Sequence, residues 1–183
     1  RGLGDVYKRQ MTNYQEGVRM QLLSRLAYRD GLTDLLNRTS YMEELKRLDA
    51  SHNFHVLLAL YDVNSLKYVN DTYGHQSGDE MIRRVADTLS AHLGSLGKCY
   101  RIGGDEFVFL STVSDSEKEF LKLQRDFEAS LGTLKLPDGS EHPITVAMGY
   151  SVLTHTMPRS MDDMVREADA KMYEAKRRMK TEN

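Results

Sequence analysis

Two short β-type runs joined by a pair of glycines constrain the fold of this chain more than any other feature. Residues 98–102 and 107–111 are rich in aromatic and β-branched residues, which favour strands. The glycines at 103–104 can adopt positive φ, so they predict a tight hairpin turn. Asp105 and Glu106 follow at the tip. Adjacent carboxylates there indicate either a site for a hard cation or acid–base chemistry, or simply an acidic turn facing solvent.

The composition is that of an ordinary globular domain, with 183 residues, 40% hydrophobic and 28% charged. The single cysteine, Cys99, excludes an internal disulfide and a zinc site made of cysteines. A net charge of −2 gives no general attraction to nucleic acid or membranes. No apolar run approaches the roughly 20 residues of a membrane span. We therefore expect a cytoplasmic protein without a nucleic-acid partner or direct membrane contact.

The first part of the chain differs from the rest. Residues 1–10 lack periodicity and precede Met11, so we interpret them as an assembly remnant and exclude them from the fold. Residues 12–28 have the apolar spacing of a helix with a narrow apolar stripe. This helix either packs on the domain or ends a longer helix arriving from an N-terminal region outside this chain. The predicted organisation is a lead-in helix over residues 11–28 and one domain over residues 29–183.

Strand and helix patterns alternate along that domain. Residues 55–63 form a near-continuous apolar run, typical of a strand buried on both faces, and residues 144–152 predict another strand. A serine followed three residues later by an acidic residue predicts the start of four helices, at Ser40, Ser77, Ser114 and Ser160, with Thr39 as an alternative cap for the first of them. The order matches the split βαββαβ pattern. It predicts an α+β fold with a ferredoxin-like antiparallel sheet, helices on one main face and the hairpin beside the first strand.

Two carboxylates become candidate metal ligands in this topology. Asp62 ends the first strand, and Asp105 lies at the tip of the neighbouring hairpin, so we expect them to be close. Such a pair suits a hard cation such as Mg²⁺, which keeps positions for water and phosphate oxygens and can bridge a nucleoside triphosphate. Glu106, beside the second carboxylate, is suited to take a proton from an attacking hydroxyl.

Other polar residues extend this hypothesis to a nucleotide. Lys67, Lys176 and Lys180 could neutralise phosphate oxygens. Asn70 and Asp79 offer the amide and carboxylate edges that read a purine. Structural alternatives stay open for these residues. Two lysines four residues apart also fit a solvated basic helix face, and an asparagine here also fits an Asx turn.

Three segments carry motifs that occur together in one family. Residues 30–38 read Asp-Gly-Leu-Thr-Asp-Leu-Leu-Asn-Arg, residues 62–79 contain an Asp-Val-Asn and a later Gly-Asp, and residues 103–107 read Gly-Gly-Asp-Glu-Phe. Together they resemble the GGDEF domain family, the diguanylate cyclases. The resemblance implies a palm-type fold similar to class III nucleotidyl cyclases. It also implies a bacterial signal-transduction enzyme that condenses two GTP molecules into cyclic di-GMP and releases pyrophosphate.

The resemblance also implies a role for each candidate residue. Asp62, Asp105 and the Val63 carbonyl would hold Mg²⁺ or Mn²⁺. Glu106 would help to deprotonate the 3′-hydroxyl. The other residues would bind substrate: Asn70 and Asp79 the guanine, Lys67, Lys176 and Lys180 the phosphates, and Gly103 and Gly104 the nucleotide through their backbone. One domain holds one GTP, so a second copy of the domain is an implied partner. A sensor region preceding this chain is implied as well.

Several positions depart from the family pattern. Asp34 stands where glycine is usual, and Asn64 replaces a common aspartate. Met179 and Lys180 replace the usual Gly-Arg. Lysine keeps the charge of arginine but loses its two-pronged phosphate grip. The product-inhibition motif R-x-x-D is replaced at residues 94–97 by Gly-Ser-Leu-Gly, so we predict no feedback site of this kind.

Three functions are compatible with these observations. The first is an active diguanylate cyclase. The second is a catalytically weak, GTP-binding regulatory module, which the changed C-terminal motif favours. The third is another nucleotidyl cyclase or a polymerase-like enzyme on the same palm, which the mass of the product would distinguish.

Overall fold

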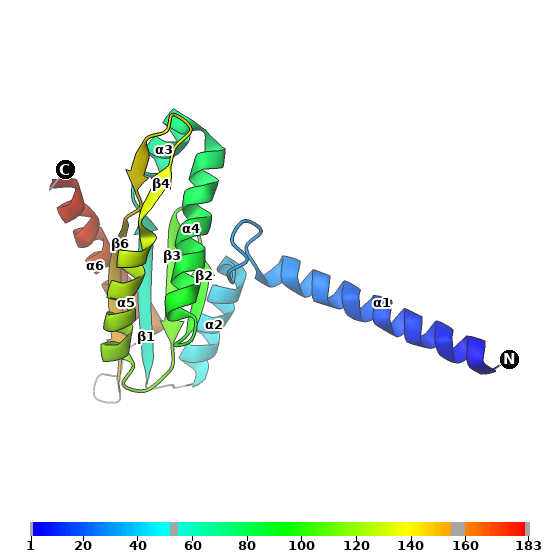
Figure 1. The fold of residues 1–183 in the computed structure, drawn as a ribbon. Coiled ribbons are helices and arrows are strands. Elements are labelled where there is room, and N and C mark those ends of the chain that lie inside the picture. The colour runs from blue at the N-terminus through cyan, green and yellow to red at the C-terminus, as the bar shows by residue number, and fades with distance from the viewer. Residues whose placement is uncertain (1, 52–54, 155–159, 182–183) are drawn as a thin grey trace.

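The computed structural model of the chain describes residues 2–51, 55–154 and 160–181, with side chains from residue 10 onward. It is an α+β fold in which helices flank a four-stranded sheet (Figure 1). The strands of this sheet are β1 (Val56–Val63), β2 (Lys98–Arg101), β3 (Glu106–Ser111) and β6 (Val146–Leu153). Their order is β2-β3-β1-β6 and all neighbouring pairs are antiparallel, as the split βαββαβ pattern predicts.

The described residues form six helices and a second, smaller sheet. The helices are α1 (Gly2–Tyr28), α2 (Arg38–Ser51), α3 (Leu66–Tyr73), α4 (His75–Leu93), α5 (Glu117–Leu131) and α6 (Met161–Thr181). The small sheet pairs β4 (Thr133–Lys135) with β5 (Glu141–Pro143). None of the described helices is long and apolar enough to cross a membrane.

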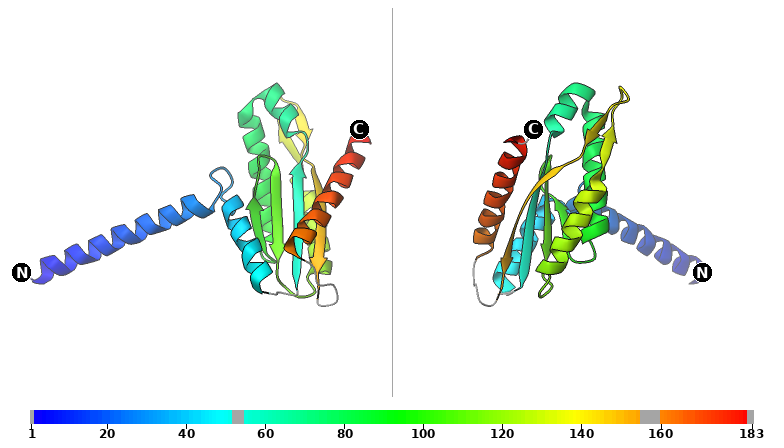
Figure 2. Two further views of the ribbon diagram at one scale, coloured as in Figure 1. Left: turned by 180° about the vertical axis from the view of Figure 1, so that it is seen from behind. Right: turned by 60° about the vertical axis from the view of Figure 1, so that its left-hand side comes forward.

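The central strand β1 is covered on both faces. Leu57, Ala59 and Tyr61 join one buried cluster with residues of α4 and α5. Leu58 and Leu60 alternate with them and join a second cluster with α2 and α6. The two helix layers lie on opposite sides of the sheet in the right-hand view of Figure 2. The expectation of helices on one main face is therefore wrong, and the second layer explains why the strand lacks polar alternation.

Helix α6 packs very closely on β6, and a glycine makes this approach feasible. A Cβ atom at Gly149 would collide with the backbone of Ala168 and Met172, so any larger residue would push the helix away. The apolar residues of α6 recur at helical spacing and are buried: Met161, Met164, Ala168 and Met172. This packing fixes the path of the helix along the sheet toward its C-terminal end.

Helix α1 extends away from the domain, as both Figure 1 and Figure 2 show. It begins at Gly2, so residues 2–10 continue the helix predicted for residues 12–28. Their interpretation as an assembly remnant stays a prediction about their origin. Several large apolar side chains of this helix are exposed: Tyr14, Met20, Leu22 and Leu26.

Among the described residues, only one of the four serines predicted to cap a helix accepts the capping hydrogen bond. At Ser160 the hydroxyl accepts a hydrogen bond of 3.1 Å from the amide three residues later, as predicted. At Ser40 the prediction is wrong, because Asn37 caps α2 by accepting the Ser40 amide at 3.0 Å. Ser77 lies inside α4, where its hydroxyl donates to the preceding turn. Ser114 precedes α5, whose cap position is Ser116, with no side-chain cap bond.

Candidate active site

The ends of β1 and β3 bring the predicted carboxylate residues together. Asp62 is the direct register partner of Glu106 across the antiparallel pair. The amide of the next residue, Val63, donates to the carbonyl of Asp105 at 2.9 Å. The predicted proximity of the first strand to the hairpin tip is therefore confirmed at the backbone. Regular strand pairing holds these residues rigidly at one edge of the sheet.

Lys176 on α6 forms an ion pair with the Asp62 carboxylate. The Nζ of Lys176 donates to both carboxylate oxygens of Asp62, each at 2.7 Å. The aspartate side chain is 11% exposed and the lysine side chain 33%. The two residues lie 114 positions apart in sequence. The sequence hypothesis placed this lysine on phosphate and did not predict this contact.

The contact between Lys176 and Asp62 indicates that this carboxylate is suited to bind a cation. Two convergent, nearly buried carboxylate oxygens already hold a positive charge, which is the donor chemistry that a hard metal ion requires. Asp105 and Val63 are neighbours of Asp62 through the backbone bond described above, in which the Val63 amide donates to the Asp105 carbonyl. Among the described residues no group of three His, Cys, Asp or Glu converges. A metal held here would therefore rely on carbonyl, water or phosphate oxygens as well, as Mg²⁺ commonly does.

Gly103 and Gly104, the signature glycines of the Gly-Gly-Asp-Glu-Phe motif, differ in what surrounds them. A Cβ atom at Gly103 would collide with the carboxylate of Glu106, whereas one at Gly104 would meet nothing within 4 Å. Neither glycine adopts positive φ, so the expected reason for their presence is wrong. Gly103 instead makes room for a side chain. The carbonyl of Glu106 closes the loop by accepting the amides of Ile102 and Gly103 at 3.0 and 3.4 Å.

Arg101, which the sequence reading missed, ties this loop to the segment that follows α1. Its guanidinium pairs with Asp30 at 3.0 Å and donates to the carbonyl of Gly104 at 2.8 Å. The amide and hydroxyl of Thr33 also donate to Asp30, at 2.9 and 2.8 Å. Burial raises the pKa of Asp30, but hydrogen bonds from Thr33 and Arg101 outweigh it, so the net pKa is lowered. An arginine two residues before the glycine pair is the sequence signal that could have indicated this link.

The predicted purine-reading residues meet where α3 joins α4. Asn70 lies inside α3, so the Asx-turn alternative is wrong. A Cβ atom at Gly78 would collide with the Asn70 amide oxygen, and Asp79 follows on α4, half-buried. This oxygen is buried and, within the described part of the chain, has no hydrogen-bond partner. A buried acceptor without a partner is costly, so it is a natural contact point for a donor on a ligand.

The remaining candidates lie further out. Lys67 on α3 and Lys180 on the last turn of α6 are exposed, and in the described ranges no hydrogen bond or ion pair links them to the carboxylates. Asn64 and Met179, two residues that depart from the family pattern, contact each other: the asparagine amide nitrogen lies 3.2 Å from the methionine sulfur. It also donates to Thr145 at 3.0 Å. The end of α6 is thus attached to the residue just after β1.

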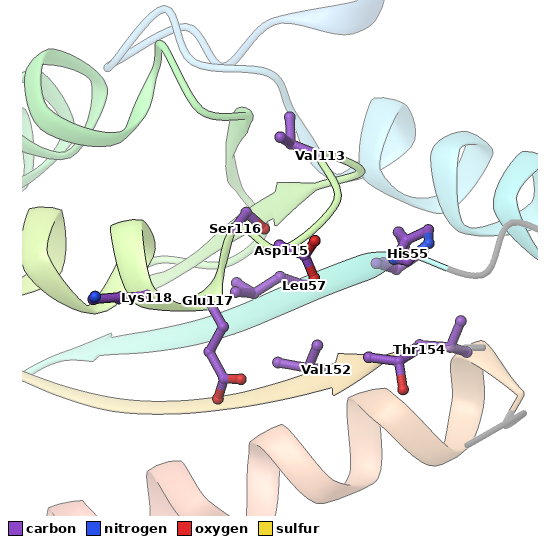
Figure 3. Close-up of a pocket in the computed structure, with 11 residues that line it drawn as sticks. His55, Leu57, Val113, Asp115, Ser116, Glu117, Lys118, Val152 and Thr154 are labelled. Carbon is purple, nitrogen blue, oxygen red and sulfur yellow. The ribbon is translucent and has the colours of Figure 1, made fainter. Parts of the chain in front are cut away.

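A cavity of about 250 Å³ lies at the opposite end of β1 from Asp62 (Figure 3). Its lining comes from the start of β1, the loop after β3, the start of α5 and the end of β6, with His55, Asp115 and Glu117 among the labelled residues. None of the predicted site residues lines it. The candidate chemistry therefore lies around Asp62 and Glu106, at the other end of β1, and not in this cavity.

Comparison with known proteins gives consistent relatives. The family model described as "Diguanylate cyclase, GGDEF domain" matches residues 27–182. Diguanylate cyclase DgcN of Escherichia coli (strain K12) is 32% identical over 161 residues, which cover 84% of this chain and 38% of that protein. Probable diguanylate cyclase DgcC of the same strain is 30% identical over 162 residues, 87% of this chain and 42% of that protein. The chain thus spans about two fifths of the length of these curated relatives.

Solved structures give the same result for the fold. The coiled coil and GGDEF domain of DgcB from Caulobacter crescentus, in complex with c-di-GMP, superposes with a TM-score of 0.79 at 28% identity, covering 94% of each chain. Diguanylate cyclase SiaD from Pseudomonas aeruginosa, in complex with its activator SiaC, has a TM-score of 0.72 at 27% identity, covering 94% of this chain and 68% of that one.

Proposed function

Because the chain belongs to the GGDEF family of diguanylate cyclases, we propose that it condenses two GTP molecules into cyclic di-GMP and releases two pyrophosphates. The observation that carries this proposal is the pairing of β1 with β3, which sets Asp62 opposite Glu106 and bonds Val63 to Asp105. The Asp62 carboxylate already binds the positively charged ammonium of Lys176, which supports a metal-assisted reaction at this edge.

The proposed metal ligands are the carboxylates of Asp62 and Asp105 and the carbonyl of Val63, holding Mg²⁺ or Mn²⁺. When bound, the ion neutralises charge on the triphosphate and makes the α-phosphate a better electrophile. Lys67, Lys176 and Lys180 supply further positive charge to the phosphates.

The other residues position the nucleotide and move a proton. The buried Asn70 oxygen and the Asp79 carboxylate accept hydrogen bonds from guanine. Glu106, exposed at the strand end, accepts the proton of the 3′-hydroxyl. The 3′-oxygen bonds to the α-phosphorus of the other GTP, the α–β bridging bond breaks, and pyrophosphate leaves. Gly103 leaves room for the Glu106 carboxylate, and Gly104 leaves the backbone open to the nucleotide.

A second copy of the chain completes the proposed reaction, because each domain holds one GTP and the two 3′-oxygens attack in opposite directions. Helix α1 supports this partner, since Tyr14, Val18, Leu22 and Leu26 recur every four residues along one side of a helix that leaves the domain and are 48–71% exposed. Pairing with the α1 helix of another copy would cover them. The solved DgcB fragment combines a coiled coil with a GGDEF domain. In a longer bacterial protein, α1 would connect this cytoplasmic domain to a sensor region.

Pyrophosphate release from GTP and Mg²⁺ tests this proposal when the protein is compared with Asp105→Asn. We expect turnover in the unchanged protein and at least about a hundredfold less in the variant, because a charge-stabilising group in the transition state is lost. Circular dichroism checks that the variant is folded. GTP binding without pyrophosphate release in dimeric protein would contradict the proposal. It would instead favour the GTP-binding regulatory module suggested by Met179 and Lys180.

A further inference from the structure

The ion pair between Lys176 and Asp62 has a consequence for metal binding. We infer that Lys176 is a built-in counter-ion that competes with the divalent cation for Asp62 and moves to the triphosphate when metal and nucleotide bind together. This inference rests on the proposed function, since it assumes that Asp62 is a metal ligand. It adds that the chain keeps its own metal site closed to metal alone.

Geometry makes the competition direct. The ammonium contacts both Asp62 oxygens at 2.7 Å, so it covers the two atoms that a metal ion would need. The aspartate side chain is only 11% exposed, which leaves little room for a second cation on the same carboxylate. A metal ion on the same carboxylate would also lie close to the Lys176 ammonium, and the two positive charges would repel each other.

The packing of α6 explains why the lysine stays in place without nucleotide. Met172, one turn before Lys176, is buried in the sheet face, and Met179, one turn after it, contacts Asn64. The helix therefore presents the lysine at a fixed position, while its four-carbon stem allows the ammonium to swing. A triphosphate offers new acceptors within that swing, so nucleotide and metal each favour the binding of the other.

Manganese binding to nucleotide-free protein tests the inference, with the free Mn²⁺ measured by electron paramagnetic resonance. We expect Lys176→Met to bind Mn²⁺ at least about tenfold more tightly than the unchanged chain, because the carboxylate has lost its competing charge. We expect the same variant to bind a non-hydrolysable GTP analogue with Mg²⁺ about tenfold more weakly, because the phosphates have lost an ammonium. A merely structural lysine would not shift the two affinities in opposite directions.

Matched variants separate this effect from overall charge and from misfolding. Arg178→Met removes one positive charge from an exposed position of the same helix and is expected to leave Mn²⁺ affinity unchanged within about twofold. Lys176→Arg keeps the charge and is expected to keep Mn²⁺ binding weak. Lys176→Gln, which keeps a polar side chain, is a second variant expected to bind Mn²⁺ more tightly. Thermal unfolding reports folding and should show a larger Mn²⁺-induced rise of Tm in both neutral variants.

Unchanged or weaker Mn²⁺ binding in folded Lys176→Met and Lys176→Gln would overturn the inference, as would an equal gain in Arg178→Met. These outcomes do not bear on the proposed reaction, which pyrophosphate release from the unchanged chain tests separately. Conversely, the unchanged chain could release no pyrophosphate while Lys176→Met still binds Mn²⁺ more tightly and the GTP analogue more weakly. That result would support the counter-ion role of Lys176 and contradict the proposed function.

Discussion

The two signature glycines look equivalent in the sequence but have different surroundings. Gly103 faces the Glu106 carboxylate so closely that a Cβ atom would collide with it, whereas the space at Gly104 is open. Both have φ values that alanine can adopt. Substitution at the two positions therefore isolates the effect of moving Glu106 from the effect of a less flexible backbone.

We predict that Gly103→Ala lowers kcat for cyclic di-GMP formation at least about tenfold, because small displacements of a reacting group are costly. Gly104→Ala adds a methyl group that does not approach Glu106, so it should retain most of kcat, whereas KM for GTP should rise because this backbone is proposed to contact the nucleotide. The measurement is steady-state kinetics on both variants, with thermal unfolding to show that each is folded. Equal losses in the two variants would mean that the loop backbone, and not the placement of Glu106, limits the rate.

Asn70 illustrates how far single residues could be read from the sequence. Its assignment to guanine rested on family resemblance, and the residue pattern alone left an Asx turn open. The structure replaces that alternative with a helical position and a buried amide oxygen without a partner among the described residues. Neither feature is visible in the sequence, because both depend on the packing of α3 against α4.

At the scale of elements, the strands were more predictable than the helix ends. The β1 run, the hairpin and β6 follow from composition and turn residues, since few other structures suit them. Three capping boxes failed because a cap depends on how the chain enters the helix. Asn37, and not Ser40, caps α2 since the Ser40 hydroxyl donates to Tyr28 at 2.7 Å instead. Helix α3 was not predicted, because it is short and lies between turn-forming residues, Asn64 and Ser65 before it and Gly74 after it.

Arg101 links Asp30, just after α1, to the loop that contains Gly104, and this contact between elements predicts a contribution to stability that is lost in acid. The lowered pKa of Asp30 means that the unfolded chain takes up its proton first as pH falls. The ionised Asp30 side chain therefore stabilises the fold fully above the ordinary carboxylate pKa, and this stabilisation is lost as pH falls through the lowered pKa. We predict that Asp30→Asn reduces the free energy of unfolding at neutral pH by about 1–2 kcal/mol.

Thermal unfolding between neutral and acidic pH measures this difference. The gap in Tm between the unchanged chain and Asp30→Asn should be constant near neutrality and should narrow in acid. Asp34→Asn, which removes an exposed carboxylate of the same segment, is the control. A gap that widens in acid would contradict the assigned role of Asp30.

At the scale of the whole molecule, the fold presents half of a reaction centre and a helix that leaves the domain. We predict that Leu22→Glu combined with Leu26→Glu shifts the chain toward monomer in analytical ultracentrifugation, because charges would enter the proposed contact between α1 helices. Cyclic di-GMP formation at low protein concentration should fall with it and should recover as concentration rises. Gln21→Glu on the same helix is the control. An active monomer would contradict the two-copy mechanism.

The sequence located the candidate residues of one copy but not their internal contacts. Asp62, Asp105 and Glu106 were expected to be neighbours because strand order follows from the split pattern. The contact of Lys176 with Asp62 could not be foreseen, because it joins side chains 114 residues apart on separate elements. For the ion pair of Arg101 with Asp30, the only sequence signal was the arginine before the glycine pair. Long-range pairs of this kind are set by the packing of α6 and of the segment after α1.

The central claim is that the chain joins two separate GTP molecules at paired Asp62–Asp105 sites. The most direct measurement is mass spectrometry of the product formed from an equal mixture of ordinary and isotope-labelled GTP with Mg²⁺. We predict cyclic di-GMP in which the species with one labelled and one unlabelled half is the most abundant, and no such product from Asp105→Asn. A product derived from a single GTP, or GTP bound by the dimeric chain without any product, would contradict the account.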